Sequence, residues 1–211
     1  MNIGIIGAGN IGANAAILFA KAGHKVAISN SKGPESLFDL VSKIGPNASA
    51  ASIEEAVRFG EVILLALPWS QRNKLPAAQV FENKIVMDAT NPYKVDQAGN
   101  YTIENLGQST SSEEILKLMP GARLVKAFNT MYFETLRDSG TKDPNKQLVL
   151  FIASDDSEAK EVVARLIEDI GFAAVDTGFL KEGGRLQQPD SAIYNVPMTV
   201  EEAKKKLTDL K

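Results

Sequence analysis

The chain has 211 residues, of which 44% are hydrophobic and 23% are charged, as is typical of a folded globular protein. The net charge of −3 argues against nucleic acids and anionic membranes as partners. The lack of Cys excludes disulfides, thiolate metal ligands and thiol nucleophiles, and we predict no metal site. The apolar N-terminal stretch has no basic region before it, so we expect a cytoplasmic protein rather than a secreted one.

The first motif is a glycine turn between an apolar strand and an apolar helix. Residues 2–6 are typical of a buried parallel strand, and residues 13–20 of a buried helix. Between them, three glycines follow the Gly-x-Gly-x-x-Gly spacing that lets a chain wrap a dinucleotide pyrophosphate. The cofactor-binding residues predicted here are Gly7, Ala8, Gly9, Asn10, Ile11 and Gly12.

Short apolar runs alternate with helical patterns along the whole chain, which predicts an α/β fold: a doubly wound, mostly parallel sheet of about eight strands with helices on both faces. We expect one domain over residues 1–211. The predicted strands are 2–6, 25–29, 48–51, 61–66, 84–88, 122–127, 147–153 and 172–176. Capping-box spacing predicts helix starts at Ser52 with Glu55, Ser111 with Glu114, Asp155 with Glu158, and Thr199 with Glu202.

The end of the second predicted strand favours NADP(H) over NAD(H). NAD-binding sheets place an acid there for the ribose 2′-hydroxyl, and such an acid would repel a 2′-phosphate. Here Ser29, Asn30 and Ser31 can donate hydrogen bonds to a phosphate, and Lys32 can supply positive charge. The alternative is that these four are ordinary polar loop residues.

Ligands bind in such sheets at the carboxyl ends of the strands, beside the point where the strand order reverses. The segments 64–69 and 87–93 should therefore flank the nicotinamide half of the cofactor. Trp69 either walls a pocket for a flat ring or belongs to the core. At the next strand end, the candidates for substrate contacts are Phe128, Asn129, Thr130 and Met131.

Two late segments lack regular periodicity. Residues 91–107 are predicted to form a long functional loop, and residues 178–197 a second irregular stretch. The C-terminal loop and helix, residues 178–211, either cover the cleft or contribute a dimer contact.

Four segments together resemble the NADPH-dependent deazaflavin-coenzyme (coenzyme F420) reductase family over essentially the whole chain. They are residues 7–12, 67–69, 125–130 and 183–189. The chain is also similar to the cytosolic part of six-transmembrane ferric reductases. The resemblance implies a Rossmann-type oxidoreductase, commonly a homodimer, that moves a hydride between NADP(H) and a small planar acceptor. It also implies that residues 29–32 hold the 2′-phosphate and that Leu67, Pro68, Asn91 and Ala127 to Thr130 border the nicotinamide and the acceptor.

The residue types agree with hydride transfer that uses no protein acid or base. The one His, His24, lies before the second predicted strand and is predicted to be structural. None of the four Tyr is followed four residues later by Lys. A flavin or deazaflavin acceptor delocalises the new charge, so we predict no catalytic acid or base. Two alternatives remain open: a redox sensor that binds NADP(H) without turnover, and a reductase of small carbonyls or imines that uses Lys126 or Tyr132.

Overall fold

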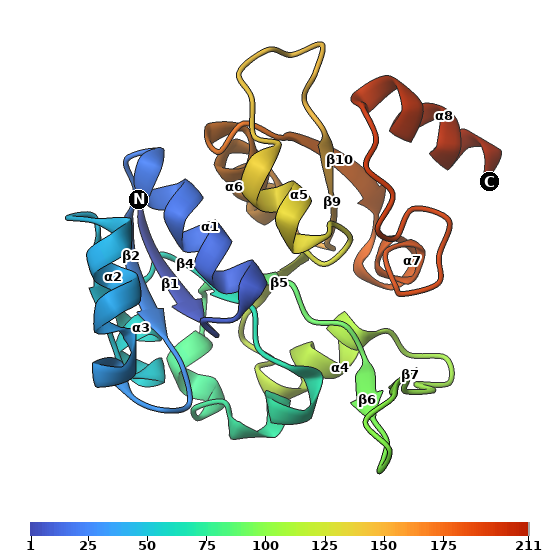
Figure 1. Ribbon diagram of the computed structural model, residues 1–211. Coiled ribbons are helices and arrows are strands. Elements are labelled where there is room, and N and C mark those ends of the chain that lie inside the picture. The colour runs from blue at the N-terminus through green and yellow to red at the C-terminus, as the bar shows by residue number, and fades with distance from the viewer. Residues whose placement is uncertain (211) are drawn as a thin grey trace.

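A computed structural model describes residues 1–210, and an eight-stranded sheet runs through its centre (Figure 1). The strand order is β10-β9-β8-β5-β4-β1-β2-β3. These strands are β1 (Asn2–Ile6), β2 (Lys25–Ser29), β3 (Ala48–Ala50), β4 (Val62–Leu65), β5 (Ile85–Asp88), β8 (Arg123–Lys126), β9 (Val149–Ala153) and β10 (Ala173–Gly178). All eight lie at predicted positions, with boundaries that differ by at most two residues.

All but one of the neighbouring strand pairs are parallel. The exception is the pair β8 and β9, which is antiparallel and joined only by Lys126 and Ala153. The carboxyl ends of β2, β1, β4, β5 and β8 therefore share one edge of the sheet, as a mostly parallel Rossmann-type sheet requires.

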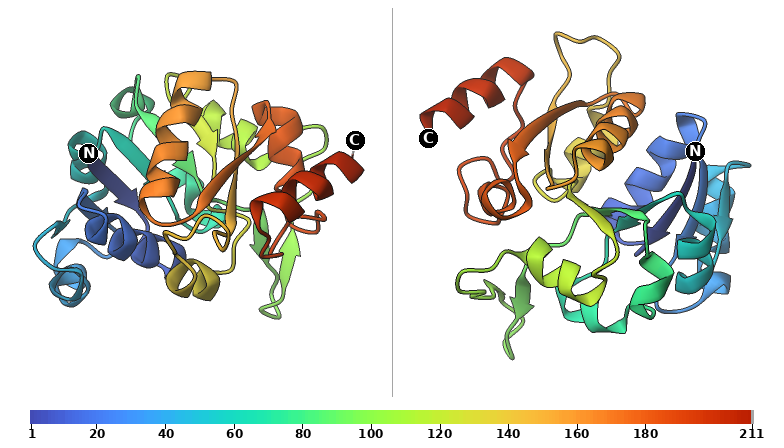
Figure 2. Two further views of the ribbon diagram at one scale, coloured as in Figure 1. Left: turned by 90° about the horizontal axis from the view of Figure 1, so that it is seen from above. Right: turned by 180° about the vertical axis from the view of Figure 1, so that it is seen from behind.

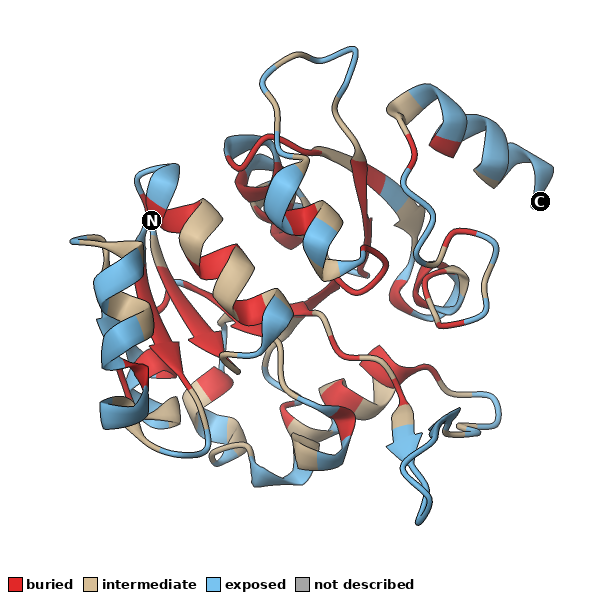
Figure 3. Cartoon of the chain, in the orientation of Figure 1, coloured by how far each residue is buried: buried red, intermediate tan, exposed pale blue. Residues whose placement is uncertain are grey.

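Helices cover both faces of the sheet, as the two further views show (Figure 2). The helices are α1 (Asn10–Lys21), α2 (Phe38–Ile44), α3 (Ile53–Phe59), α4 (Ser111–Leu118), α5 (Phe133–Asp138), α6 (Ser157–Asp169), α7 (Leu180–Leu186) and α8 (Val200–Asp209). Three short 3₁₀ helices are η1 (Pro34–Leu37), η2 (Trp69–Lys74) and η3 (Ala78–Phe81). One core packs α1, α5 and α6 against one face, and a second packs α3, α4 and α7 against the other. The inner strands are almost entirely buried between these layers, whereas the edge strands β3 and β10 are mostly only partly buried (Figure 3).

Two of the four predicted capping boxes are confirmed, one is displaced by one residue, and the fourth is replaced by a simple N-cap. Ser52 and Thr199 cap α3 and α8 as predicted. The box of α4 is formed by Thr110 with Glu113 rather than by Ser111 with Glu114, and α6 is capped by Asp156 rather than Asp155. For α4, two adjacent pairs satisfy the same spacing, so the pattern alone could not choose between them. For α6, Asp156 caps the helix by accepting from the Ala159 amide, and Ala159 has no carboxylate that could complete a box.

The two segments predicted as irregular contain regular structure. The loop 91–107 holds an antiparallel hairpin of β6 (Tyr93–Val95) and β7 (Tyr101–Ile103), which projects from the body of the molecule (Figure 1). The stretch 178–197 contains α7. The sequence pattern did not predict this helix, because it contains Gly183 and Gly184 and glycine is a poor helix former. A side chain at Gly183 would lie 2.8 Å from the Thr177 backbone, so close packing requires glycine there.

Within residues 1–210, no helix has the length and apolar character needed to cross a membrane. The same residues hold no cluster of three or more potential metal ligands from His, Asp and Glu.

Candidate functional site

The glycine turn between β1 and α1 has the geometry that its spacing predicts. Gly7 has a φ of 109°, and a side chain there would lie 2.3 Å from the Ala66 carbonyl oxygen. A side chain at Gly12 would lie 1.9 Å from the Gly7 carbonyl oxygen. In contrast, a Cβ at Gly9 would meet no atom within 4 Å. Gly7 and Gly12 are therefore required by the turn itself, whereas Gly9 leaves open space in front of the helix.

The N-terminus of α1 has amide groups free to bind an anion. Gly9 is the N-cap residue, no side chain caps the helix, and its first turn carries no acidic residue. The first intrahelical hydrogen bond runs from the Ala13 amide to the Gly9 carbonyl, so the amides of Asn10, Ile11 and Gly12 precede the helical hydrogen-bond series. The uncapped helix end and the open space at Gly9 fit the pyrophosphate of a dinucleotide.

Beyond β2, the four residues predicted to bind the 2′-phosphate occupy two environments. Ser29 is fully buried, and its hydroxyl donates to the Ile5 carbonyl at 2.9 Å, so this side chain is part of the sheet. Asn30 organises the loop: its Oδ1 accepts from the Lys32 amide at 2.9 Å and its Nδ2 donates to Ser36 Oγ at 2.9 Å. Ser31 and Lys32 are exposed. The side chains available to a phosphate are thus those of Ser31 and Lys32, because the Ser36 hydroxyl already donates to the Gly33 carbonyl at 2.7 Å.

At the end of β4, the structure supports the core alternative for Trp69. Its side chain is only 3% exposed and packs within the second core. The indole nitrogen donates to Glu104 Oε2 at 2.5 Å, and the Arg72 guanidinium lies 4.1 Å from the ring centroid. The predicted acceptor contact at Trp69 is therefore corrected to a structural role, while Leu67 is half-buried and Pro68 is exposed at the same strand end.

Hydrogen bonds join the ends of β5 and β8. Asn91 Nδ2 donates to the Asn129 carbonyl oxygen at 3.0 Å, and Asn129 Nδ2 donates to Asn91 Oδ1 at 3.1 Å. Asn129 Nδ2 also donates to the Gln187 carbonyl oxygen at 2.7 Å, which brings in the residue after α7. The structure therefore brings together two residues that the sequence assigned separately to cofactor and substrate.

Phe128 lies in the core rather than against a ligand. Its side chain is fully buried and its ring packs edge-on against Phe19, with centroids 5.9 Å apart, so the predicted acceptor contact by this side chain is not supported. Its φ of 64° lies in the left-handed region, which a bulky residue adopts at a cost of about 1–3 kcal/mol. The left-handed conformation of Phe128 turns the chain between the buried residues Ala127 and Asn129. Backbone strain of this kind is often found at functional sites.

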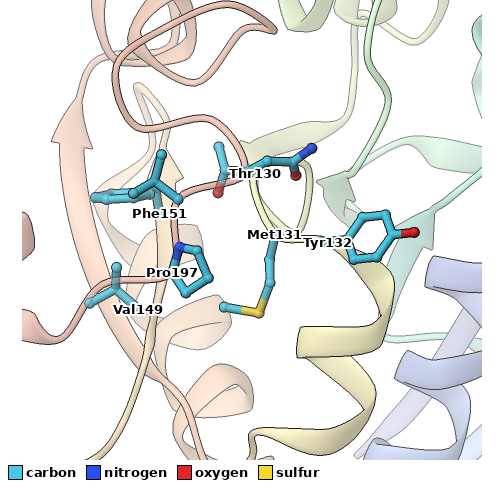
Figure 4. A pocket seen from close by; sticks show the side chains of 8 residues that line it. Thr130, Met131, Tyr132, Val149, Phe151 and Pro197 are labelled. Carbon is cyan, nitrogen blue, oxygen red and sulfur yellow. The ribbon is translucent and has the colours of Figure 1, made fainter.

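The remaining predicted acceptor residues, Thr130 and Met131, border a small cavity with Phe151 and Pro197 (Figure 4). Its volume of about 10 Å³ leaves room for at most one water molecule. In the close-up, the Tyr132 ring points away from this cavity, and its side chain is about half exposed. A planar acceptor therefore needs space beside the cavity rather than within it.

An ion pair lies beneath the strand ends, between Lys126 of β8 and Asp88 of β5. Both side chains are fully buried, and Lys126 Nζ lies 3.1 Å from Asp88 Oδ2. Lys126 also donates to the Thr90 carbonyl and, at 3.1 Å, to Ser111 Oγ. Asp88 accepts from Thr90 Oγ1 at 2.7 Å and from Ser112 Oγ at 2.6 Å.

Burial lowers the pKa of Lys126 from its ordinary value, and the charge of Asp88 opposes that shift. Because Lys126 has no exposed surface, it cannot serve as the carbonyl contact that one sequence alternative assigned to it. Its hydrogen bonds instead hold Thr90, and so position the neighbouring Asn91.

Two tyrosines that sequence reasoning did not assign to the site lie beside Asn91. Asn91 Nδ2 donates to the Tyr194 hydroxyl at 3.2 Å, and the hydroxyls of Tyr93 and Tyr194 are 3.3 Å apart. They are 101 residues apart in the chain, so no local pattern could reveal the pair. His24, predicted to be structural, lies elsewhere: its Nε2 is 3.2 Å from Asp169 Oδ2, and burial lowers its pKa.

Comparison with known proteins places this architecture in a family. Residues 2–92 match the family model described as NADP oxidoreductase, coenzyme F420-dependent. A hypothetical protein from Sinorhizobium meliloti shares 33% sequence identity with the chain, over 94% of this chain and 95% of that protein, with a TM-score of 0.84. The chain belongs to the coenzyme F420-dependent NADP oxidoreductase family. This family assignment confirms the resemblance found in the sequence.

Other solved structures share the Rossmann-type fold of the family. A protein from Arthrobacter sp., described provisionally as an F420-dependent NADP reductase, is 22% identical over 94% of this chain and 99% of that chain, with a TM-score of 0.75. An imine reductase from Pseudomonas sp. is 16% identical over 87% of this chain but only 57% of its own, with a TM-score of 0.61. The match covers little more than half of the imine reductase, so a large part of that protein has no counterpart in this chain.

Proposed function

We propose that the protein transfers a hydride between NADP(H) and a small planar acceptor of the deazaflavin or flavin type. Membership of an NADP oxidoreductase family supports the general activity. The main structural support for NADP(H) binding is the uncapped N-terminus of α1, which has open space beside it at Gly9. Gly9 and the amides of residues 10–12 would hold the pyrophosphate, while Ser31 and Lys32 would hold the 2′-phosphate. When bound, NADPH supplies the hydride.

The proposal of a planar acceptor is based on the polar groups that lie at the ends of β5 and β8. The groups that meet there are the amides of Asn91 and Asn129 and the hydroxyls of Tyr93 and Tyr194. Neutral groups of this kind orient a ring and stabilise partial charge, and alignment can supply much of the rate enhancement. An acceptor that delocalises the charge it gains suits such a site better than a small ketone, which needs a proton donor with a tuned pKa.

The acceptor is tested by following NADPH oxidation with coenzyme F420, FMN, lumiflavin and a ferric chelate. We expect sustained turnover with at least one ring acceptor, and loss of that turnover in the Gly9→Ala variant, which links the activity to the glycine turn. Tight NADPH binding with no turnover on any acceptor would contradict the proposal and favour the sensor alternative. The predicted homodimer and cytoplasmic location stay predictions.

A further inference from the structure

The hairpin of β6 and β7 places four apolar side chains on one face, and three of them are largely exposed. Its register pairs Tyr93 with Ile103 and Val95 with Tyr101, and alternate residues of a strand point to the same face. Tyr101 is 75% exposed, Val95 59% and Ile103 39% (Figure 3). A hairpin of two strands is only marginally stable in water, and an apolar face is stable when further strands or another layer adjoin it.

The outer edge of β7 has backbone groups that are free to pair with another strand. Beside the turn of the hairpin, the Asp96 amide donates to the Asn100 carbonyl oxygen at 3.0 Å. Bonded and non-bonded pairs alternate along an antiparallel hairpin, so the N–H and C=O groups of Tyr101 and Ile103 point away from β6. Within residues 1–210, β7 pairs only with β6. The exposed strand β7 is therefore an open edge.

The residues of β7 suit pairing with the same strand of a second copy of the chain. Antiparallel pairing about a two-fold axis at Thr102 puts Tyr101 opposite the partner's Ile103, and it satisfies the outward N–H and C=O groups of both residues. None of the three residues of β7 is charged, so no like charges meet. The same arrangement along β6 would put Lys94 opposite the partner's Lys94, which disfavours that edge.

We propose that two copies of the protein associate through β7, so that their hairpins form one four-stranded antiparallel sheet. The apolar side chains of both hairpins then share one face of this sheet, as a stable sheet requires. Cross-strand pairs of an aromatic and a β-branched residue, Tyr101 with the partner's Ile103, add stability, and the two Thr102 hydroxyls meet on the opposite face. Because the edge is short, we expect a dimer that dissociates on dilution.

The pairing is connected to the candidate site through Tyr93 of β6. The hydroxyl of Tyr93 lies 3.3 Å from that of Tyr194, which accepts from Asn91 Nδ2. A hairpin held by a second copy therefore also holds one hydroxyl of the site in place. The inference itself needs no assumption about the acceptor, and it assigns the dimer contact to the hairpin instead of to residues 178–211.

The test uses the variant Thr102→Glu. Within one chain the added carboxylate lies beside Lys94, the cross-strand neighbour of Thr102, so the hairpin itself should be kept. In the dimer, two carboxylates would lie directly opposite each other. The matched control is Gln97→Glu, which makes the same change of charge at an exposed position in the turn of the hairpin, outside β7. A third variant, Thr102→Lys, is mixed with Thr102→Glu, because the mixture places opposite charges across the two-fold axis.

Sedimentation velocity over a range of protein concentrations measures the dissociation constant of the dimer. We expect the wild type and Gln97→Glu to form the same dimer, and Thr102→Glu to raise the dissociation constant by about tenfold or more, because like charges meet at the interface. The mixture of the two Thr102 variants should associate more tightly than either variant alone. Amide hydrogen exchange followed by NMR should show protection of Tyr101 and Ile103 in the wild-type dimer and its loss in Thr102→Glu.

A wild type that stays monomeric at every concentration would overturn the inference. A wild-type dimer whose dissociation constant is unchanged in Thr102→Glu would also overturn it, since that dimer would use another surface. A mixture that associates no better than its components would contradict the two-fold pairing at position 102. Turnover enters none of these measurements, so their outcome is independent of whether the proposed function is correct.

Discussion

Replacing Gly9 with alanine is expected to weaken NADPH binding at least tenfold while leaving the fold nearly as stable as before. The backbone at Gly9 has a φ of −77° and a ψ of −169°, which any residue adopts, and a Cβ there meets no protein atom. The added methyl group would instead occupy the space through which the pyrophosphate approaches the helix. The loss of the glycine N-cap should cost no more than about 1 kcal/mol. Calorimetric titration with NADPH and urea unfolding measure the two effects separately.

The matched variant Gly12→Ala should show the opposite balance. Its Cβ would lie 1.9 Å from the Gly7 carbonyl oxygen, which is backbone and cannot simply rotate away. We expect the free energy of unfolding to fall by about 2–3 kcal/mol or more, as overpacking of this kind usually causes. A Gly9→Ala protein that binds NADPH as tightly as the wild type would show that the open space at Gly9 is not where the diphosphate binds.

Replacing Lys126 with methionine is expected to destabilise the protein by about 3–5 kcal/mol, because it leaves the Asp88 carboxylate buried and unpaired. Both side chains have no exposed surface, and Asp88 is held in place by hydrogen bonds from Thr90 and Ser112. Adding Asp88→Asn to this variant should recover part of the loss, since no buried charge then remains. Urea unfolding of the single and double variants gives the difference directly.

The control for this prediction is Lys117→Met, which removes a similar contact at the surface. Lys117 Nζ lies 2.6 Å from Glu114 Oε1, but its side chain is 66% exposed. Exposed pairs contribute little, so we expect a change of about 0.5 kcal/mol or less. A loss for Lys126→Met as small as that for Lys117→Met would mean that the buried pair does not hold the strand ends together.

The sequence was sufficient to predict the sheet and the glycine turn because both rest on local signals. Apolar runs placed all eight strands of the sheet, and the spacing of Gly7, Gly9 and Gly12 identified a turn whose close contacts the structure bears out. Local sequence patterns did not predict the helices and strands that are rich in glycine or polar residues. The hairpin of β6 and β7 and the short helix α7 are examples. Close packing of Gly183 against the Thr177 backbone accounts for α7, whereas the hairpin is mostly exposed and is joined by pairing of its own two strands.

The candidate site was harder to predict, because a strand-end position does not say which way a side chain points. Ser29, Trp69 and Phe128 occupy the predicted strand ends, yet their side chains turn into the protein. The sequence also gave no sign that Lys126 pairs with Asp88 or that Tyr93 meets Tyr194, because these contacts join residues 38 and 101 positions apart. Such pairs arise only once the strand order and the C-terminal segment are placed in space.

Calorimetric titration with NADPH and NADH tests most directly the claim that the glycine turn and the residues after β2 together hold NADP(H). The variant to compare with the wild type is Ser31→Asp/Lys32→Ala, whose two positions are exposed and should not affect folding. Charge-assisted contacts to a phosphate contribute about 1.5–3 kcal/mol each, so wild type should bind NADPH at least tenfold more tightly than NADH. The double variant should lose that preference. Binding of neither nucleotide by the wild type, or an unchanged preference in the variant, would contradict the account.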